Sequence, residues 1–213
     1  MLASPMATVR TVVDFVTLMR HPTRLDVVIR MADRLATVGP TMDDIRAMLG
    51  TTEEGRVALR DRPRLGPVDV AALLGLPEGT LGHAYATHLV KNGLDPAALP
   101  VREARDDAGY VMAHLYETHD VWHAVTGFDA DIAGEVGLQA FYLAQMPDRF
   151  SALLVAGGLL QATLFAFDDH GARMDALVRG WTMGRKTRPL FGVRWAERWE
   201  ERLDEVRRGL AIA

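Results

Sequence analysis

The stretch "HLYETHDVWHAVTGFDADIAGE", His114 to Glu135, predicts two consecutive helices that carry a cluster of polar side chains. On a helix with about 100° per residue, His119 and His123 lie within about 40° of each other, and Asp120 lies about 60° further around. The three side chains therefore share one sector of the first helix. Gly127 favours the end of that helix, and the residues after it begin a second one.

The sector that holds the two histidines is expected to face the interior, because Met112 and Tyr116 extend the same stripe. Burying an unpaired polar group costs on the order of 1–3 kcal/mol, so two inward imidazoles need partners. A divalent cation would satisfy both nitrogens at once. The pattern thus indicates a metal site, and the alternative is a pair of core histidines beside a structural acid.

The second helix is expected to start near Asp129 or Asp131, since carboxylates at a helix start interact favourably with the helix dipole. Glu135 then shares a largely apolar face with Leu138 and Tyr142, where a carboxylate is costly without a counter-charge. We expect the two helices to form an antiparallel hairpin. Glu135 would then join the ligand set on the first helix.

The chain contains no cysteine, so a metal can be held only by nitrogen and oxygen ligands. Imidazole and carboxylate suit Zn, Fe, Mn or Co, and a carboxylate-rich set with open positions also admits Mg; zinc is expected first. The absence of cysteine also excludes disulfides and cysteine nucleophiles, and it fits a reducing compartment.

Composition and periodicity predict the fold class. Among 213 residues, 49% are hydrophobic and 24% charged, which suits one compact domain spanning residues 1–213. Apolar residues recur at helical spacing almost throughout, so we expect an all-α, multi-helix domain of roughly nine or ten helical pieces. The net charge of −4 provides no basic field, and nucleic acid is excluded as a partner.

Two segments bear on membranes. The apolar run Ser151 to Phe167 has 17 residues, at the lower margin of the roughly 17–25 that span a bilayer, and Gln161 favours a buried helix instead. At the amino terminus, Arg10 and Asp14 interrupt the short apolar pieces, so we interpret it as mature and cytoplasmic rather than as a secretory signal.

The carboxyl-terminal stretch Arg194 to Ile212 predicts one amphipathic helix that covers the core. Its apolar stripe is Trp195, Trp199, Leu203, Val206 and Leu210.

The other histidines are interpreted individually. His114 points away from the cluster and is expected to be a helix-packing or surface residue. His83 and His88 lie on another helix without a visible partner. His21 and His170 are expected at helix ends.

The segment "HDVWH", followed by eleven residues and Glu135, reproduces the pattern His-Asp-x-x-His-x11-Glu. This pattern resembles the signature of the coenzyme Q biosynthesis protein four family, an all-helical family of mitochondria and some bacteria. The resemblance covers nearly the whole chain in order and spacing. It includes "LRDRPRL", "LPEGTLGHAYATHL", "GEVGLQAFYLAQMP", "GRK" and "RWAERWEERLDEVRRGL".

The resemblance implies that His119, Asp120, His123 and Glu135 are metal ligands, one of which can act through water. Asp120 and Glu135 are also the candidate catalytic residues, with Asp120 either a ligand or the base that orients one. The implied substrate is a polyprenylated hydroxybenzoate, and the implied activity is that of a decarboxylase, a lyase that also oxidises the ring carbon. No flavin or nicotinamide fingerprint is present, so dioxygen or a partner would be the oxidant.

Contacts to the substrate are expected from residues near these positions. Gly157 and Gly158 remove side-chain volume and could leave a groove for an isoprenoid tail, although tight helix packing explains them equally well. Arg185 and Lys186 could pair with an anionic head group, although cations at a helix end usually complement its dipole. Lys186 departs from the resemblance, which leads us to expect arginine at this position. The candidate substrate contacts are Tyr116, Tyr142, Gly157, Gly158, Arg185 and Lys186.

The expected partners are a prenylated aromatic or isoprenoid lipid, a second copy of the chain, and other quinone-biosynthesis enzymes. Because such a lipid is nearly insoluble, we expect the protein to dock at a membrane surface through its amino-terminal third, peripheral to the inner membrane. Two alternatives are a non-catalytic isoprenoid-binding scaffold and a metal phosphohydrolase that uses the His-Asp pair.

Overall fold

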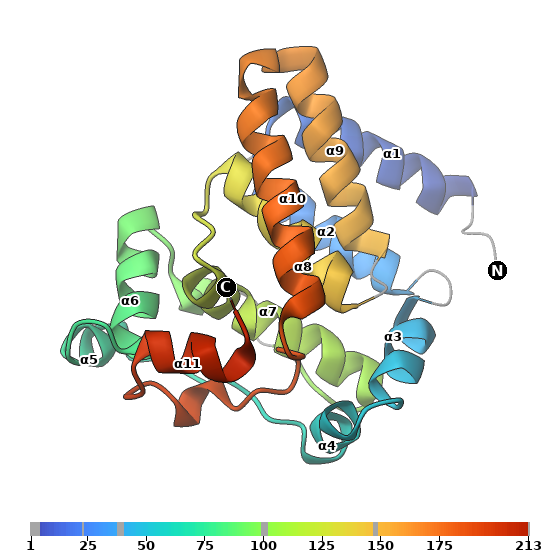
Figure 1. The fold of residues 1–213 in the computed structure, drawn as a ribbon. Helices are drawn as coiled ribbons and strands as arrows, with labels where there is room; N and C mark the ends of the chain where they lie inside the picture. The colour runs from blue at the N-terminus through green and yellow to red at the C-terminus, as the bar shows by residue number, and fades with distance from the viewer. Residues whose placement is uncertain (1–4, 23, 38–40, 99–101, 147–148, 213) are drawn as a thin grey trace. The chain divides into compact units, whose positions relative to one another are not determined.

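The computed structural model describes residues 5–22, 24–37, 41–98, 102–146 and 149–212. Within these ranges the chain is helical, and its extended segments contribute one isolated bridge, between Thr80 and Arg202 (Figure 1). The all-α prediction is confirmed. Among the described residues, no helix combines the length and the apolar character needed to cross a bilayer. The α-helices are α1 (Pro5–Arg20), α2 (Leu25–Thr37), α3 (Thr41–Leu49), α4 (Glu53–Asp61), α5 (Val70–Leu74), α6 (Leu81–Asn92), α7 (Asp107–Thr126), α8 (Ile132–Gln145), α9 (Arg149–Phe165), α10 (His170–Lys186) and α11 (Leu203–Leu210).

The helices group into two compact units, each built from separate stretches of chain. The first unit holds Met1–Ala47 and Asp131–Arg185, and the second holds Met48–Ala130 and Lys186–Ala213. Because both units draw on distant stretches, neither is a contiguous segment that composition could delimit. The expectation of one domain over residues 1–213 stays a prediction.

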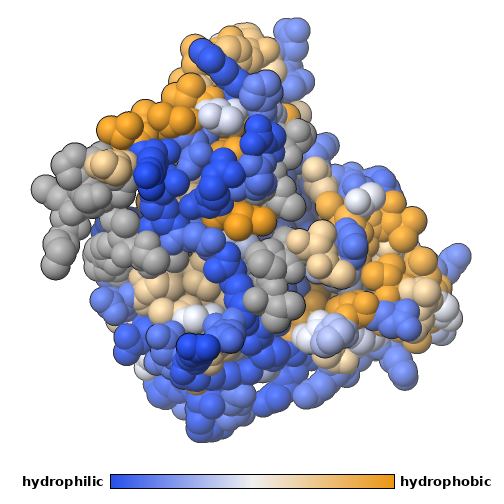
Figure 2. All heavy atoms as spheres, turned by 180° about the vertical axis from the view of Figure 1, so that it is seen from behind, coloured by the Kyte–Doolittle hydropathy of each residue, from blue (hydrophilic) through white to orange (hydrophobic). Residues whose placement is uncertain are grey.

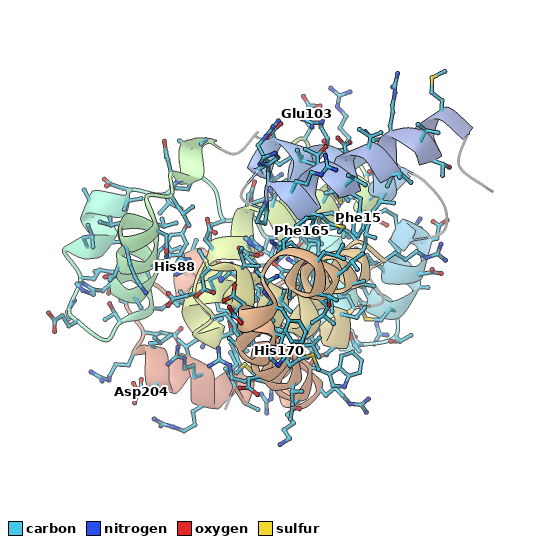
Figure 3. All side chains as sticks on the ribbon, turned by 90° about the horizontal axis from the view of Figure 1, so that it is seen from above. Phe15, His88, Glu103, Phe165, His170 and Asp204 are labelled. Atoms are coloured by element: carbon cyan, nitrogen blue, oxygen red, sulfur yellow. The ribbon has the colours of Figure 1, made fainter. Side chains whose placement is uncertain are left out.

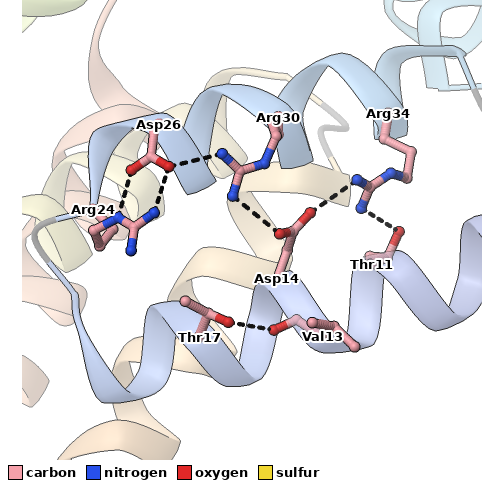
Figure 4. Close-up of polar contacts among 8 residues, drawn as sticks. All are labelled: Thr11, Val13, Asp14, Thr17, Arg24, Asp26, Arg30 and Arg34. Carbon is pink, nitrogen blue, oxygen red and sulfur yellow. Dashed lines mark hydrogen bonds and ion pairs between the residues drawn. The ribbon is translucent and has the colours of Figure 1, made fainter.

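Charged groups connect α1 to α2. The carboxylate of Asp14, whose residue is 8% exposed, accepts hydrogen bonds from Arg30 at 3.3 Å and pairs with Arg34 at 2.9 Å (Figure 4). With Asp14 turned toward α2, the opposite face of α1 is left to solvent. That face carries four exposed valines at helical spacing: Val9, Val12, Val13 and Val16.

Helices α9 and α10 form a hairpin in the first unit, joined by the short 3₁₀ helix Phe167–Asp169 (Figure 1). In α9 only Ser151, Gly157 and Ala162 are buried, whereas Leu164 and Phe165 are 57% and 58% exposed. The expectation of a buried helix is therefore wrong for the carboxyl-terminal half of this run. Figure 2 shows hydrophobic residues exposed beside hydrophilic ones on the molecular surface.

Helix α10 lies directly against α8 because a glycine stands at the contact. A Cβ atom on Gly180 would come within 1.9 Å of the Gly137 carbonyl oxygen. Backbone atoms cannot move aside as a side-chain tip can, so this approach requires glycine.

Helix α7 is the longest helix of the second unit, and α6 and α11 pack against it. Asp106 caps its start by accepting a hydrogen bond from the Gly109 amide at 2.7 Å. Gly127 ends it in the left-handed conformation, with φ of 71°, where the sequence predicted the end. Arg207 of α11 donates to the carbonyl oxygen of Val125 at 2.8 Å and so holds the last turn of α7.

His114 of α7 is fully buried and connects three segments of the second unit. Its Nδ1 lies 3.1 Å from the Pro63 carbonyl oxygen, and its Nε2 accepts a hydrogen bond from the Gly192 amide at 3.0 Å. The structure thus confirms a packing histidine rather than a surface one.

The predicted carboxyl-terminal helix is wrong as a continuous element. The segment forms a 3₁₀ turn at Trp195–Glu197 and then α11. Between them, the carbonyl oxygens of Trp199 and Glu201 accept hydrogen bonds from the Gly82 and Leu81 amides, at 2.9 and 2.8 Å. The break follows because these carbonyls satisfy the first turn of α6 instead of continuing a helix of their own. Trp195, Val206 and Leu210 are buried, as their apolar spacing suggested.

Candidate metal centre

One sector of α7 brings together the residues predicted as ligands. One ligand atom each from His119, Asp120 and His123 lie within 4.8 Å of one another. The two imidazole rings meet edge to face, with centroids 4.8 Å apart and planes at 88°. His123 is buried, and the other two are partly exposed, so the cluster is reachable from one side.

The end of α7 orients His123. Gly127 turns the chain back, and its amide donates to the His123 carbonyl oxygen at 2.9 Å. The Phe128 carbonyl oxygen consequently lies 3.0 Å from Nδ1 of the His123 ring. A carbonyl only accepts, so Nδ1 carries the proton and Nε2 keeps its lone pair.

This donor set fits a divalent metal. Two imidazoles and a carboxylate are the ligands of catalytic zinc sites and of related Fe, Mn or Co sites. Metal-bound histidines usually donate their second nitrogen to a carbonyl or carboxylate, as His123 does here.

Glu135 lies in the first turn of α8 and is partly exposed. The helix begins at Asp131, whose side chain accepts from the Gly134 amide at 2.7 Å, so the predicted start is confirmed. Because α8 belongs to the first unit and the cluster to the second, both the helical hairpin and ligation by Glu135 stay predictions.

His88 of α6 is a functional candidate that the sequence did not reveal (Figure 3). Its ring stacks on His123, with centroids 5.1 Å apart and planes at 18°. Burial, and secondly the neighbouring His123, lower the pKa of His88 below its ordinary value. The expectation that His88 has no partner is wrong. One sequence signal could have indicated that His88 faces the interior. It lies three residues after Tyr85 and seven after Leu81, at helical spacing from these two buried residues of α6.

The remaining histidines have structural contacts. Nδ1 of His83 lies 3.2 and 3.1 Å from the carbonyl oxygens of Leu74 and Leu76, so it holds the end of α5, and the expectation of no partner is again wrong. His21 follows the end of α1 and His170 begins α10, as predicted.

A pocket of about 440 Å³ adjoins the cluster within the second unit. His88 and His123 both line it, together with Lys91 and Asp129, which form an ion pair at 2.7 Å. The pocket gives a small polar molecule access to the His123 ring.

The predicted substrate contacts have varied surroundings. The guanidinium of Arg102 lies 4.1 Å above the Tyr116 ring, and Tyr142 is buried in α8. Arg185 and Lys186 are exposed in the last turn of α10, a position that suits dipole complements. Their roles toward substrate stay predictions.

Gly157 and Gly158 serve close packing in this structure. A Cβ atom on Gly157 would meet the Phe15 ring at 2.8 Å, and one on Gly158 would meet Val136 at 2.5 Å. Neighbouring side chains thus fill the space where a groove was considered. Lipid contact at these glycines stays a prediction.

Fold and site together define an all-α protein with a His-Asp-x-x-His cluster suited to a divalent metal. The family model described as "Coenzyme Q (ubiquinone) biosynthesis protein Coq4" matches residues 5–213. The chain therefore belongs to the Coq4 family, in agreement with the resemblance of its motifs.

Known proteins resemble this chain over most of its length. The ubiquinone biosynthesis protein COQ4 homolog 1, mitochondrial, of Culex quinquefasciatus is 33% identical over 86% of this chain and 69% of its own. The ubiquinone biosynthesis protein COQ4, mitochondrial, of Coprinopsis cinerea is 30% identical, with 90% and 66% covered. The crystal structure of a candidate ubiquinone biosynthesis protein from Nostoc punctiforme PCC 73102 matches with a TM-score of 0.83 and 28% identity, over 96% of this chain and 98% of that one.

Proposed function

We propose that this protein is a metal-dependent enzyme of ubiquinone biosynthesis. Its substrate would be the head group of a polyprenylated hydroxybenzoate. The protein would remove the ring carboxyl group and oxidise the carbon that carried it. The observation that carries this proposal is the His119, Asp120 and His123 cluster beside a pocket in the second unit.

Each residue of the predicted ligand set would have a defined role. His119 and His123 would hold a divalent ion, His123 through Nε2 because Nδ1 is engaged with Phe128. Asp120 and Glu135 would complete the ligand set or hold a proton at a carboxylate oxygen. When bound, the ion acts as a Lewis acid toward the carboxylate and a phenolic oxygen of the ring. The oxidation also needs an electron acceptor, which would be dioxygen or a partner enzyme.

The test is turnover by the purified protein. Metal-loaded protein is incubated in air with a short-chain prenylated hydroxybenzoate, and mass spectrometry follows the loss of the carboxyl group and the gain of oxygen. We expect turnover by the wild type, loss of turnover in His123→Ala and Glu135→Ala, and full turnover in His170→Ala, an exposed histidine outside the cluster. A wild type that leaves the substrate unchanged under every metal would contradict the proposal.

A second candidate function is an isoprenoid-binding scaffold that organises other enzymes. The exposed apolar residues of the first unit favour it, since they could contact a lipid without any chemistry. If Glu135→Ala abolishes turnover while lipid binding is preserved, the scaffold alone does not explain the protein.

We also propose that the protein docks at a membrane surface, and the valine face of α1 supports this. Val9, Val12, Val13 and Val16 are between 43% and 61% exposed, while the charged Asp14 faces α2. Apolar side chains of this kind partition into the boundary between head groups and acyl chains.

Liposome flotation tests this docking. We expect the wild type to float and the double variant Val12→Asp/Val13→Asp to stay in the aqueous fraction. Val90→Asp, at an exposed valine of α6, is the matched control and should float like the wild type. A wild type that stays in solution would contradict membrane docking, and light scattering would then show whether a second copy covers this face.

A further inference from the structure

His88 is a half-buried histidine beside the metal cluster to which the proposed function assigns no task. Its ring stacks on His123, yet stacking alone needs only an aromatic ring and no second nitrogen. Among the residues that the structure describes, Nε2 of His88 is buried and has no hydrogen-bond partner. A buried donor or acceptor without a partner costs about 1–3 kcal/mol, so its presence calls for a ligand.

Asn92 identifies the proton-bearing nitrogen of His88. The Asn92 amide nitrogen donates to the His88 carbonyl oxygen at 2.9 Å, which identifies that atom as the NH₂ group. The same nitrogen lies 3.4 Å from Nδ1 of the His88 ring. An NH₂ group only donates, so Nδ1 is the acceptor and the proton of the neutral ring is on Nε2. His88 therefore presents a buried N–H donor, whose partner would be a hydrogen-bond acceptor such as an oxygen atom.

The surroundings place that donor next to the metal ligands. The rings of His88 and His123 are nearly parallel with centroids 5.1 Å apart, so the His88 ring lies directly against one of the proposed ligands. Both rings line the same pocket, whose volume of about 440 Å³ can admit a small aromatic acid.

We infer that His88 is a positioning residue of the metal centre, whose Nε2–H donates a hydrogen bond to the oxygen ligand that completes the coordination. The ligand class is an oxygen anion, the carboxylate or phenolate of an aromatic acid. This inference rests on the proposed metal site and extends it to a residue on a different helix.

The experiment uses the full chain loaded with Co²⁺ and titrated with 4-hydroxybenzoate, with the visible spectrum of the cobalt as readout. His88→Phe keeps the stacked ring and removes the donor, whereas His88→Gln keeps an amide donor. Val90→Ala is the matched control, because Val90 is exposed on the same helix and is not among the residues that line the pocket.

We expect cobalt affinity to stay within about twofold in all variants. Affinity for 4-hydroxybenzoate should fall about tenfold or more in His88→Phe, as for loss of one hydrogen bond to a charged group. His88→Gln should recover most of that loss, and Val90→Ala should match the wild type.

Unchanged binding of 4-hydroxybenzoate by His88→Phe would overturn the inference and leave the proposed function intact. Loss of cobalt together with the probe in both His88 variants would also overturn it, because His88 would then support the fold or ligate the metal. A wild type that binds cobalt but does not bind 4-hydroxybenzoate would also overturn the inference and leave the metal site intact. A wild type that binds no cobalt refutes the metal site itself, which is a distinct result.

Discussion

His123 directs Nδ1 toward the carbonyl oxygen of Phe128, 3.0 Å away and five residues further along the chain. This contact depends on the left-handed turn at Gly127, which brings the backbone back over the last turn of α7. One local feature therefore ends the helix and fixes the tautomer of the ring, with the lone pair on Nε2.

His114 predicts how stability depends on pH. Burial lowers its pKa from 6.5 to about 4, because the charged ring loses its solvation, and the bond that Nε2 accepts from the Gly192 amide also requires the neutral ring. The unfolded chain therefore binds a proton first as pH falls. The free energy of unfolding should decline between about pH 6.5 and pH 4, by about 3 kcal/mol in total.

Urea denaturation at several pH values measures this decline. His114→Gln should flatten the dependence within that window, and His170→Gln, at an exposed histidine, should leave it unchanged. A His114→Gln curve parallel to the wild type would show that another group is responsible.

Gly180 predicts a packing effect on stability. Alanine at this position would place Cβ 1.9 Å from the Gly137 carbonyl oxygen, so α10 must shift from α8. We expect Gly180→Ala to cost about 3 kcal/mol of unfolding free energy or more. Gly171→Ala on the same helix, where nothing lies within 4 Å, should stabilise by about 0.5–1 kcal/mol. Equal effects of the two substitutions in thermal denaturation would contradict the described packing.

Arg207 predicts that α11 stabilises the helix carrying the cluster. Its guanidinium donates to the carbonyl oxygens of Val125 and Ala124, at 2.8 and 3.1 Å, where a cation also complements the helix dipole. Arg207→Met should cost about 2 kcal/mol. Arg208→Met removes only the exposed pair with Asp204 and should cost less than about 0.5 kcal/mol. Denaturant unfolding distinguishes the two, and similar losses would rule out this role for Arg207.

Asp14 predicts how firmly α1 is attached to α2. Asp14→Asn weakens the partly buried pairs with Arg30 and Arg34 and should cost about 1–3 kcal/mol. Asp26→Asn, at an exposed carboxylate paired with Arg24 and Arg30, should cost clearly less than Asp14→Asn, because solvent screens its ion pairs. Hydrogen exchange along α1 reports the difference, and unaltered protection in Asp14→Asn would contradict this attachment.

Local patterns were sufficient for much of the fold. Helical periodicity predicted the all-α class, Gly127 predicted the end of α7, and Asp129 or Asp131 was expected at the start of α8, where the structure has Asp131. These predictions succeeded because caps act within one turn of chain. The convergence of His119, Asp120 and His123 also followed from spacing on one helix.

Local sequence patterns could not predict contacts between distant segments. The break after Trp195 arises because the carbonyls of Trp199 and Glu201 serve the first turn of α6, which no local propensity records. His88 reaches the cluster only through the packing of α6 on α7. In α1 the charged Asp14 is buried against α2 and the valines are exposed, the opposite of the usual arrangement. The pairing of Asp14 with Arg34 of α2, a contact between two helices, accounts for this orientation.

Metal content of the purified chain is the most direct test of the central claim. After loading with Zn²⁺ and removal of excess ion, elemental analysis should find about one zinc per chain in the wild type and in His170→Ala. His119→Ala/His123→Ala should retain almost none while keeping its helical circular dichroism. A folded wild type without zinc, or a double variant that binds as much zinc as the wild type, would contradict the proposed centre.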